Sequence, residues 1–170
     1  WVSDETSAIA TYGEINTWDV SLITDMSFLF DDSQIGSVNL SNWDVSNVLD
    51  MSYMFRNAQY FNGNISDWDV SNVINMLYMF DMALTQNSVF NGDLSDWDVS
   101  NVTNMVGMFE STTSFNGDLS NWDVTNVTNF TNIFYNASAL SSTNKYLIHQ
   151  NTTFSSNSAW PYDWSIYAPY

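Results

Sequence analysis

The 170-residue sequence contains no cysteine, only two basic residues and a single histidine, His149. Without cysteine it can form neither disulfides nor thiolate metal sites, and it offers no thiol nucleophile. Against the two basic residues stand 19 aspartates and glutamates, which gives a net charge of −17. This charge repels nucleic acids and anionic membranes and favours cations or basic partners. Because His149 falls in the expected C-terminal cap, neither a catalytic triad nor a multi-histidine metal site is expected.

Long hydrophobic runs are also missing. No stretch approaches the roughly 18 apolar residues of a membrane-spanning helix, so no direct membrane insertion is expected. The chain starts at Trp1 in what looks like globular sequence, and any targeting segment is expected to lie outside it. The composition is 45% hydrophobic and 16% aromatic, which suits one domain with a continuous core.

What the sequence does contain is a repeat. Trp-Asp-Val recurs at Trp18, Trp43, Trp68, Trp97 and Trp122. The copies are 25 residues apart, except for a third interval of 29, which holds four extra residues between Phe80 and Phe90. Self-similarity at such a period indicates stacked repeats, each unable to bury its own apolar side.

One copy shows the pattern within the repeat. From Leu94, apolar and polar residues alternate, which predicts a short strand with Trp97 on the buried face and Asp98 on the opposite face. The apolar spacing then changes to three and four residues as far as Phe109, which predicts a short helix or 3₁₀ turn. A Phe-Asn-Gly turn closes the copy, and Gly117 is expected to have left-handed backbone.

These patterns predict an α/β fold, namely a right-handed leucine-rich-repeat-like solenoid of five repeats of about 25 residues. Each repeat would contribute a short parallel strand and a short helix or 3₁₀ turn, and stacking would place Trp43 beside Trp68. The predicted boundaries are an N-terminal cap over residues 1–14, the solenoid over 15–138 and an aromatic C-terminal cap over 139–170. Caps are expected because the open ends of a solenoid expose its core. The alternative for the aromatic tail is a platform that stacks on sugar rings.

The repeats resemble those of BspA-type leucine-rich repeat surface proteins, in the variant catalogued as a domain of unknown function in mycoplasma lipoproteins and marine microbes. The residues that carry the resemblance are WDVSNVLDMSYMF from Trp43, WDVSNVINMLYMF from Trp68, WDVSNVTNMVGMF from Trp97, WDVTNVTNFTNIF from Trp122, and the FNG turns at Phe61, Phe90 and Phe115. The resemblance implies a secreted or surface protein with a role in adhesion, and no catalytic residue. Trp replaces the usual Leu, and Val48 and its equivalents replace the usual Asn, so a buried asparagine ladder is not expected.

Aspartate columns on the polar strand face are the predicted binding residues. They comprise Asp44, Asp67, Asp69, Asp96, Asp98 and Asp123. Two interpretations stay open: a solvated acidic face whose carboxylates accept hydrogen bonds, or Ca²⁺ sites formed by Asp67, Asp69, Asp96 and Asp98. No cofactor is required in either case. A glycosidase pair such as Asp69 and Asp98 is less favoured, because the same Asp occurs in every repeat as a structural residue would.

Two further sets of residues complete the sequence predictions. Asn-x-Ser/Thr sequons, which matter as glycosylation acceptors if the source is a eukaryote, occur at Asn39, Asn64, Asn101, Asn126, Asn129, Asn136 and Asn151. Assembly contacts in the aromatic tail would come from Trp160, Tyr162, Trp164, Tyr167 and Tyr170.

The expected function is an extracellular or cell-surface recognition module without enzymatic activity. It would bind a glycan or protein through its acidic sheet face or loop edge, with Ca²⁺ as an optional participant. The first alternative is a subunit of an extracellular filament or coat that contacts copies of itself. A polysaccharide-degrading enzyme is the less favoured third class.

Overall fold

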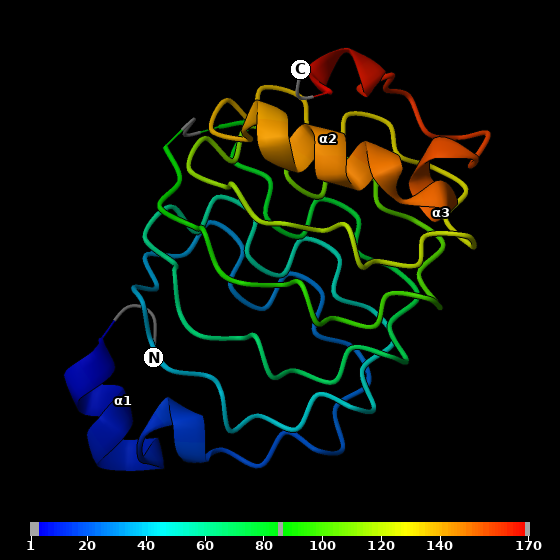
Figure 1. Ribbon diagram of the computed structural model, residues 1–170. Coiled ribbons are helices and arrows are strands. Elements are labelled where there is room, and N and C mark those ends of the chain that lie inside the picture. The colour runs from blue at the N-terminus through cyan, green and yellow to red at the C-terminus, as the bar shows by residue number, and fades with distance from the viewer. Residues whose placement is uncertain (1–3, 85–86, 169–170) are drawn as a thin grey trace.

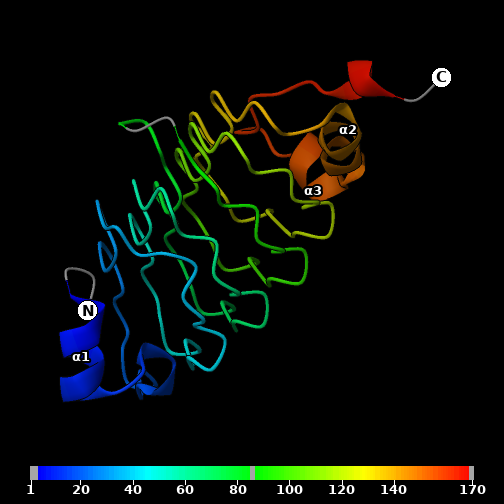
Figure 2. The same cartoon turned by 90° about the vertical axis from the view of Figure 1, so that its left-hand side faces the viewer.

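The structure is a computed structural model that describes residues 4–84 and 87–168. Its helices lie at the two ends of the chain: α1 (Glu5–Tyr12) and η1 (Ile15–Thr17) come first, and α2 (Ser142–Gln150), α3 (Thr152–Ser155) and η2 (Ser165–Tyr167) come last. Between them the chain winds in irregular coils that stack on one another (Figures 1 and 2). We number these coils 1 (residues 15–39), 2 (40–64), 3 (65–93), 4 (94–118) and 5 (119–138).

The predicted fold class is wrong. Within the described residues the coils contain no strand and no helix of the expected kind, so the chain is not a leucine-rich-repeat solenoid of parallel strands. Parallel pairing is reduced to isolated bridges that link successive coils at one position, Asp25 to Asp50, Asp50 to Asn75, Asn75 to Asn104 and Asn104 to Asn129. The alternation of buried and exposed side chains around Trp97 is nevertheless observed, since Trp97 and Val99 are buried while Asp96 and Asp98 are exposed.

Overlapping turns explain why no helix forms where the apolar spacing predicted one. In coil 2 the N–H of Met54 bonds to the carbonyl of Met51 at 3.2 Å, and the N–H of Arg56 bonds to that of Tyr53 at 3.2 Å. Tyr53 lies between them with a φ of 59°, and this left-handed residue prevents a right-handed helix from continuing. Alternate N–H groups, those of Met51, Tyr53 and Phe55, bond to carbonyls of the next coil, as Tyr53 does to Leu77 at 2.8 Å. Turns and inter-coil bonds thus use the backbone groups that a helix would use.

The core is a set of aromatic columns that run through the stack. Trp43 stacks on Trp68 with ring centroids 6.3 Å apart, as the repeat predicted, and Trp68 stacks on Trp97 at 6.5 Å. Each indole N–H also donates to a carbonyl of the preceding coil, as Trp68 does to Leu40 at 3.0 Å. A second column joins one phenylalanine per coil in the order Phe30, Phe55, Phe80, Phe109, Phe134. Burial of these rings holds the coils together in place of a sheet.

The Phe-Asn-Gly turns need glycine for a different reason from the one predicted. Gly63, Gly92 and Gly117 are absent from the residues with positive φ, so left-handed backbone is not their role. Instead, the phenylalanine two residues earlier folds over each glycine, and a Cβ on Gly117 would lie 2.6 Å from the Phe115 ring. The motif therefore needs glycine because the phenylalanine ring approaches its backbone closely, and not because of a special backbone conformation.

The two ends of the stack are covered unequally (Figure 2). At the C-terminal end α2, α3 and the tail pack over coil 5, where Ile148 and Phe154 are fully buried. At the N-terminal end α1 leaves apolar side chains of coil 1 in solvent, including Leu22 at 88% exposure. None of the helices in the described part of the chain has the length and apolar character needed to cross a bilayer.

Candidate functional site

The predicted aspartate columns lie in tight local turns on the exposed face. Asp44 Oδ1 accepts from Ser46 Oγ at 2.6 Å and from Ser46 N at 3.1 Å, and these bonds lower the pKa of Asp44. The negative charge of Asp19 acts in the other direction, because it raises that pKa. The side chains of Asp69 and Asp98 accept in the same way from the N–H of Ser71 and Ser100. The repeated carboxylates are therefore integrated into backbone turns.

Of the remaining members of this set, Asp123 has a similar setting. The hydroxyl and N–H of Thr125 lower the pKa of Asp123, and Asp67 and Asp96 are exposed. No three acidic or histidine side chains come together as a metal-binding group anywhere in residues 4–84 and 87–168. The calcium site stays a prediction, and turn hydrogen bonds account for the carboxylates of Asp44, Asp69, Asp98 and Asp123 without it.

Exposed asparagine side chains form ladders along the same surface, unlike the buried ladder that was not expected. Asn72 Nδ2 donates to Ser46 O at 2.8 Å, and Asn101 and Asn126 repeat this contact with the preceding coil. Asn151 Nδ2 donates instead to Ser120 O and Trp122 O, and Asn136 Nδ2 donates to Ser111 Oγ at 3.4 Å. Four of the seven sequons therefore use their amide as a structural donor. In the others, Asn39, Asn64 and Asn129, the side chain accepts from the N–H two residues later.

The aromatic tail packs against the chain's own core. Trp164 is 7% exposed, with its ring centroid 5.6 Å from that of Phe134. Trp160 meets Phe130 edge-on at 5.1 Å, and Tyr162 and Tyr167 are partly buried against the same core. Tyr170 lies outside the described residues. Most of the surface predicted to make assembly contacts is thus engaged within the molecule.

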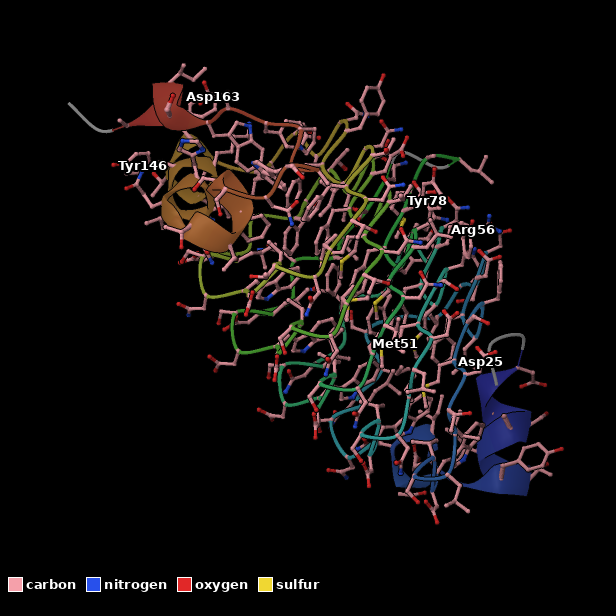
Figure 3. All side chains as sticks on the ribbon, turned by 90° about the vertical axis from the view of Figure 1, so that its right-hand side faces the viewer. Asp25, Met51, Arg56, Tyr78, Tyr146 and Asp163 are labelled. Carbon is pink, nitrogen blue, oxygen red and sulfur yellow. The ribbon has the colours of Figure 1, made fainter. Side chains whose placement is uncertain are left out.

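A different edge of the stack combines aromatic and charged side chains. We define the charged aromatic edge as two neighbouring columns: an aromatic column of Phe28, Tyr53 and Tyr78, and a charged column of Asp31, Arg56, Asp81 and Glu110. Figure 3 shows Arg56 and Tyr78 close together on this edge, far from the helices at the C-terminal end. Both columns occur where the repeats differ from one another.

The aromatic column is held in unfavourable backbone conformations. Phe28, Tyr53 and Tyr78 have φ values of 59°, 59° and 51°, whereas the same position is Gly107 in coil 4 and Asn132 in coil 5. Each bulky residue in this region costs about 1 to 2 kcal/mol. The rings stack at 4.5 Å and 5.5 Å between centroids, and a Cβ on Gly107 would collide with the Tyr78 ring. The column therefore ends at Gly107 because the ring needs that space.

The charged column surrounds a hollow of about 260 Å³ lined by Tyr53, Arg56, Tyr78, Asp81, Ala83 and Glu110. Asp81 is 6% exposed, and its Oδ1 accepts from Ala83 N at 2.8 Å. Burial raises the pKa of Asp81 to about 6; the Ala83 N–H opposes the rise, Glu110 adds to it, and Arg56 again opposes it. The Oε2 atom of Glu110 is buried without a hydrogen-bond partner. Carboxyl groups in such surroundings are typical of binding and catalytic sites.

Sequence reasoning missed this edge because it followed the residues that repeat. A signal was present in the residue that directly follows each Met-x-x-Met-Phe segment or its equivalent. In the five repeats this residue is Asp31, Arg56, Asp81, Glu110 and Tyr135. A column that changes its charge among near-identical repeats is not required by the repeat, and functional sites are expected where local patterns break.

Comparison with known proteins identifies relatives only at the level of a family model. A model described as "Mycoplasma protein of unknown function, DUF285" matches residues 3–88 and, in a second match, residues 82–159. No curated protein matches the chain, and no solved structure matches it. The two matches together cover all five coils, α1, η1, α2 and α3, but not η2.

Proposed function

The chain belongs to DUF285, a Mycoplasma protein family of unknown function, and we propose that it is a non-enzymatic extracellular recognition module. It binds its partner through the charged aromatic edge and not through the aspartate turns. The observation that carries this proposal is the left-handed backbone of Phe28, Tyr53 and Tyr78. Strain of this kind persists at functional sites, where it positions side chains that local preferences would exclude.

Two further observations support the proposal. The edge combines partly exposed aromatic side chains, with Phe28 at 51% exposure, and charged groups that are partly or fully buried, and such a combination supplies both contact area and specificity in protein interfaces. The repeats also resemble those of BspA-type surface proteins, and the extracellular location in our proposal rests on that resemblance. The leucine-rich-repeat architecture is no part of the proposal, because the coils form no strand in residues 15–84 and 87–138.

The double variant Tyr53→Asn, Tyr78→Asn tests the edge without removing the fold. Asn132 shows that the coils accept asparagine at this position with a φ of 60°. Relief of left-handed strain, about 1 to 2 kcal/mol per residue, offsets the loss of stacking, about 0.5 to 1.5 kcal/mol per ring pair. We therefore expect an almost unchanged Tm and at least a roughly tenfold loss of binding, or about 1.4 kcal/mol, on arrays of glycans and of basic peptides.

The matched control is Tyr60→Asn, which removes an exposed tyrosine, 52% accessible, from outside the edge. Its binding should equal that of the unmodified protein. If the double variant binds as well as the control, the charged aromatic edge is not the recognition surface.

A second candidate function, assembly into a filament or coat, is favoured by the N-terminal end of the stack. Backbone carbonyls of Asp50 and Ser52 accept N–H groups of coil 1, but the equivalent carbonyls of Asp25 and Ser27 accept none from the described residues. With Leu22 exposed beside them, this end offers acceptors and apolar surface to another molecule. Sedimentation velocity over a concentration series discriminates the candidates, since assembly requires concentration-dependent oligomers.

A further inference from the structure

The charged aromatic edge already binds one cation, the guanidinium of Arg56. Its guanidinium forms a two-pronged pair with Asp31, with Nε to Oδ1 at 2.7 Å and Nη2 to Oδ2 at 2.5 Å. The same group lies 4.9 Å from the ring centroid of Tyr53 and 5.9 Å from that of Phe28. A cation is therefore held between a carboxylate of one coil and the aromatic column, an arrangement that combines ionic, hydrogen-bond and cation–π attraction.

One coil further along, the same elements recur without a cation of their own, and the neighbouring Arg56 is already paired with Asp31. Tyr78 continues the aromatic column, while Asp81 of coil 3 and Glu110 of coil 4 continue the charged column. The chain has only one other lysine or arginine, Lys145, which lies 5.3 Å from the ring of Tyr167 near the C-terminal end. Arg56 lines the same hollow but is paired with Asp31, so no unpaired lysine or arginine of the described chain is available to these carboxylates.

The hollow at this position favours a positively charged ligand. Its two carboxyl groups face a single positive charge, Arg56, which Asp31 already neutralises through the two-pronged pair. The buried Oε2 of Glu110 has no hydrogen-bond partner, and Asp81 is almost fully removed from solvent. Burying carboxylate oxygens without donors is unfavourable, so a ligand that brings N–H donors and positive charge removes this cost.

We propose that the hollow between Tyr78, Asp81 and Glu110 binds the guanidinium of an arginine side chain from a partner protein. The inference rests on the proposed recognition function and specifies its chemistry. A guanidinium fits better than an ammonium because its planar fork donates to two carboxylates while its face or edge lies against an aromatic ring. The partner is consequently a basic protein surface, in agreement with the net charge of −17.

The test uses ethylguanidinium chloride as the probe and two-dimensional NMR of the full chain at constant ionic strength. Saturable shifts are expected at the amides of Ala83 and Glu110, with a dissociation constant in the millimolar range, about 1 to 10 mM. In the double variant Asp81→Asn, Glu110→Gln, the affinity should fall at least roughly tenfold. Asp98→Asn, a carboxylate-to-amide change on the exposed turn of coil 4, should alter it less than about twofold. Shifts that never saturate, or equal losses in both variants, overturn the proposal.

Glu110→Arg provides a second test, in which a cation is added and the loss of ligand binding does not come only from removing carboxylates. It places a guanidinium of the chain itself beside Asp81, as Arg56 lies beside Asp31 in the neighbouring pair of coils. The variant should fill the hollow, raise the Tm and abolish the ethylguanidinium shifts; retained binding would contradict the proposal. If the probe fails to bind but the tyrosine double variant still loses array binding, the edge remains the recognition surface and the cationic ligand is wrong.

Discussion

Replacing Trp68 with alanine is expected to lower the free energy of unfolding by about 3 to 5 kcal/mol. The side chain is 3% exposed and stacks between Trp43 and Trp97 in the middle of the column. Its indole N–H also donates to Leu40 O at 3.0 Å, so the variant leaves a cavity and removes one of the two donors to that carbonyl, the other being the N–H of Trp43. Urea unfolding followed by circular dichroism gives the change directly.

Two comparison variants separate these contributions. Trp68→Phe keeps most of the stacked ring but loses the donor, and should cost about 1 to 2 kcal/mol. Leu22→Ala alters a side chain that is 88% exposed and should stay within about 0.5 kcal/mol. A loss below about 1 kcal/mol for Trp68→Ala would mean that the aromatic columns do not hold the coils together.

Replacing Gly63 with alanine is expected to cost about 3 kcal/mol or more, because the added methyl group overpacks a backbone contact. The new Cβ would collide with the carbonyl of Val38 in the preceding coil and lie 2.9 Å from Cε2 of Phe61. A backbone carbonyl cannot rotate away as a side chain can, so coils 1 and 2 must separate locally. Thermal unfolding should show a clear fall in Tm.

Gly36→Ala is the matched control for this substitution. Nothing lies within 4 Å of a Cβ added at Gly36, and neither glycine has a positive φ. The control should be neutral or stabilising by up to about 1 kcal/mol, since alanine reduces the entropy of the unfolded chain. Equal effects at both glycines would show that backbone freedom, and not the close approach of the coils, explains the Phe-Asn-Gly motif.

The repeat in the sequence identified what stacks, but not the backbone that carries it. Trp43 lies on Trp68 as predicted, because a buried aromatic residue at a constant position must meet its equivalent in the next coil. The strand and helix assignments failed at residues such as Tyr53, whose left-handed φ interrupts any regular element. Periodicity reports which side chains are buried, and several backbone paths can bury the same set.

The candidate site was beyond prediction from the repeat for a related reason. Asp44 and Asp98 were predicted as binding residues because they recur, yet each accepts hydrogen bonds within its own turn. Asp81 and Glu110 recur nowhere as a pair, and their relation depends on folding, which brings coils 3 and 4 together around one hollow. Burial of Asp81 is likewise a property of the folded stack.

The buried carboxyl of Asp81 also links stability to pH. Its pKa is raised to about 6 from an ordinary value of 3.8, so the folded protein holds this proton more tightly than the unfolded chain does. The ionised form therefore destabilises the fold above about pH 6, and this cost is removed as the pH falls through 6 towards 4. A bound guanidinium favours the ionised form and should lower the pKa of Asp81.

The carboxyl titration of Asp81, followed by ¹³C NMR with and without ethylguanidinium, tests the central claim most directly. We expect a midpoint near 6 for the protein alone and a clearly lower midpoint when the probe is saturating. A midpoint near 4 in both titrations would contradict it, because Asp81 would then be an ordinary solvated carboxylate with no need of a cationic partner.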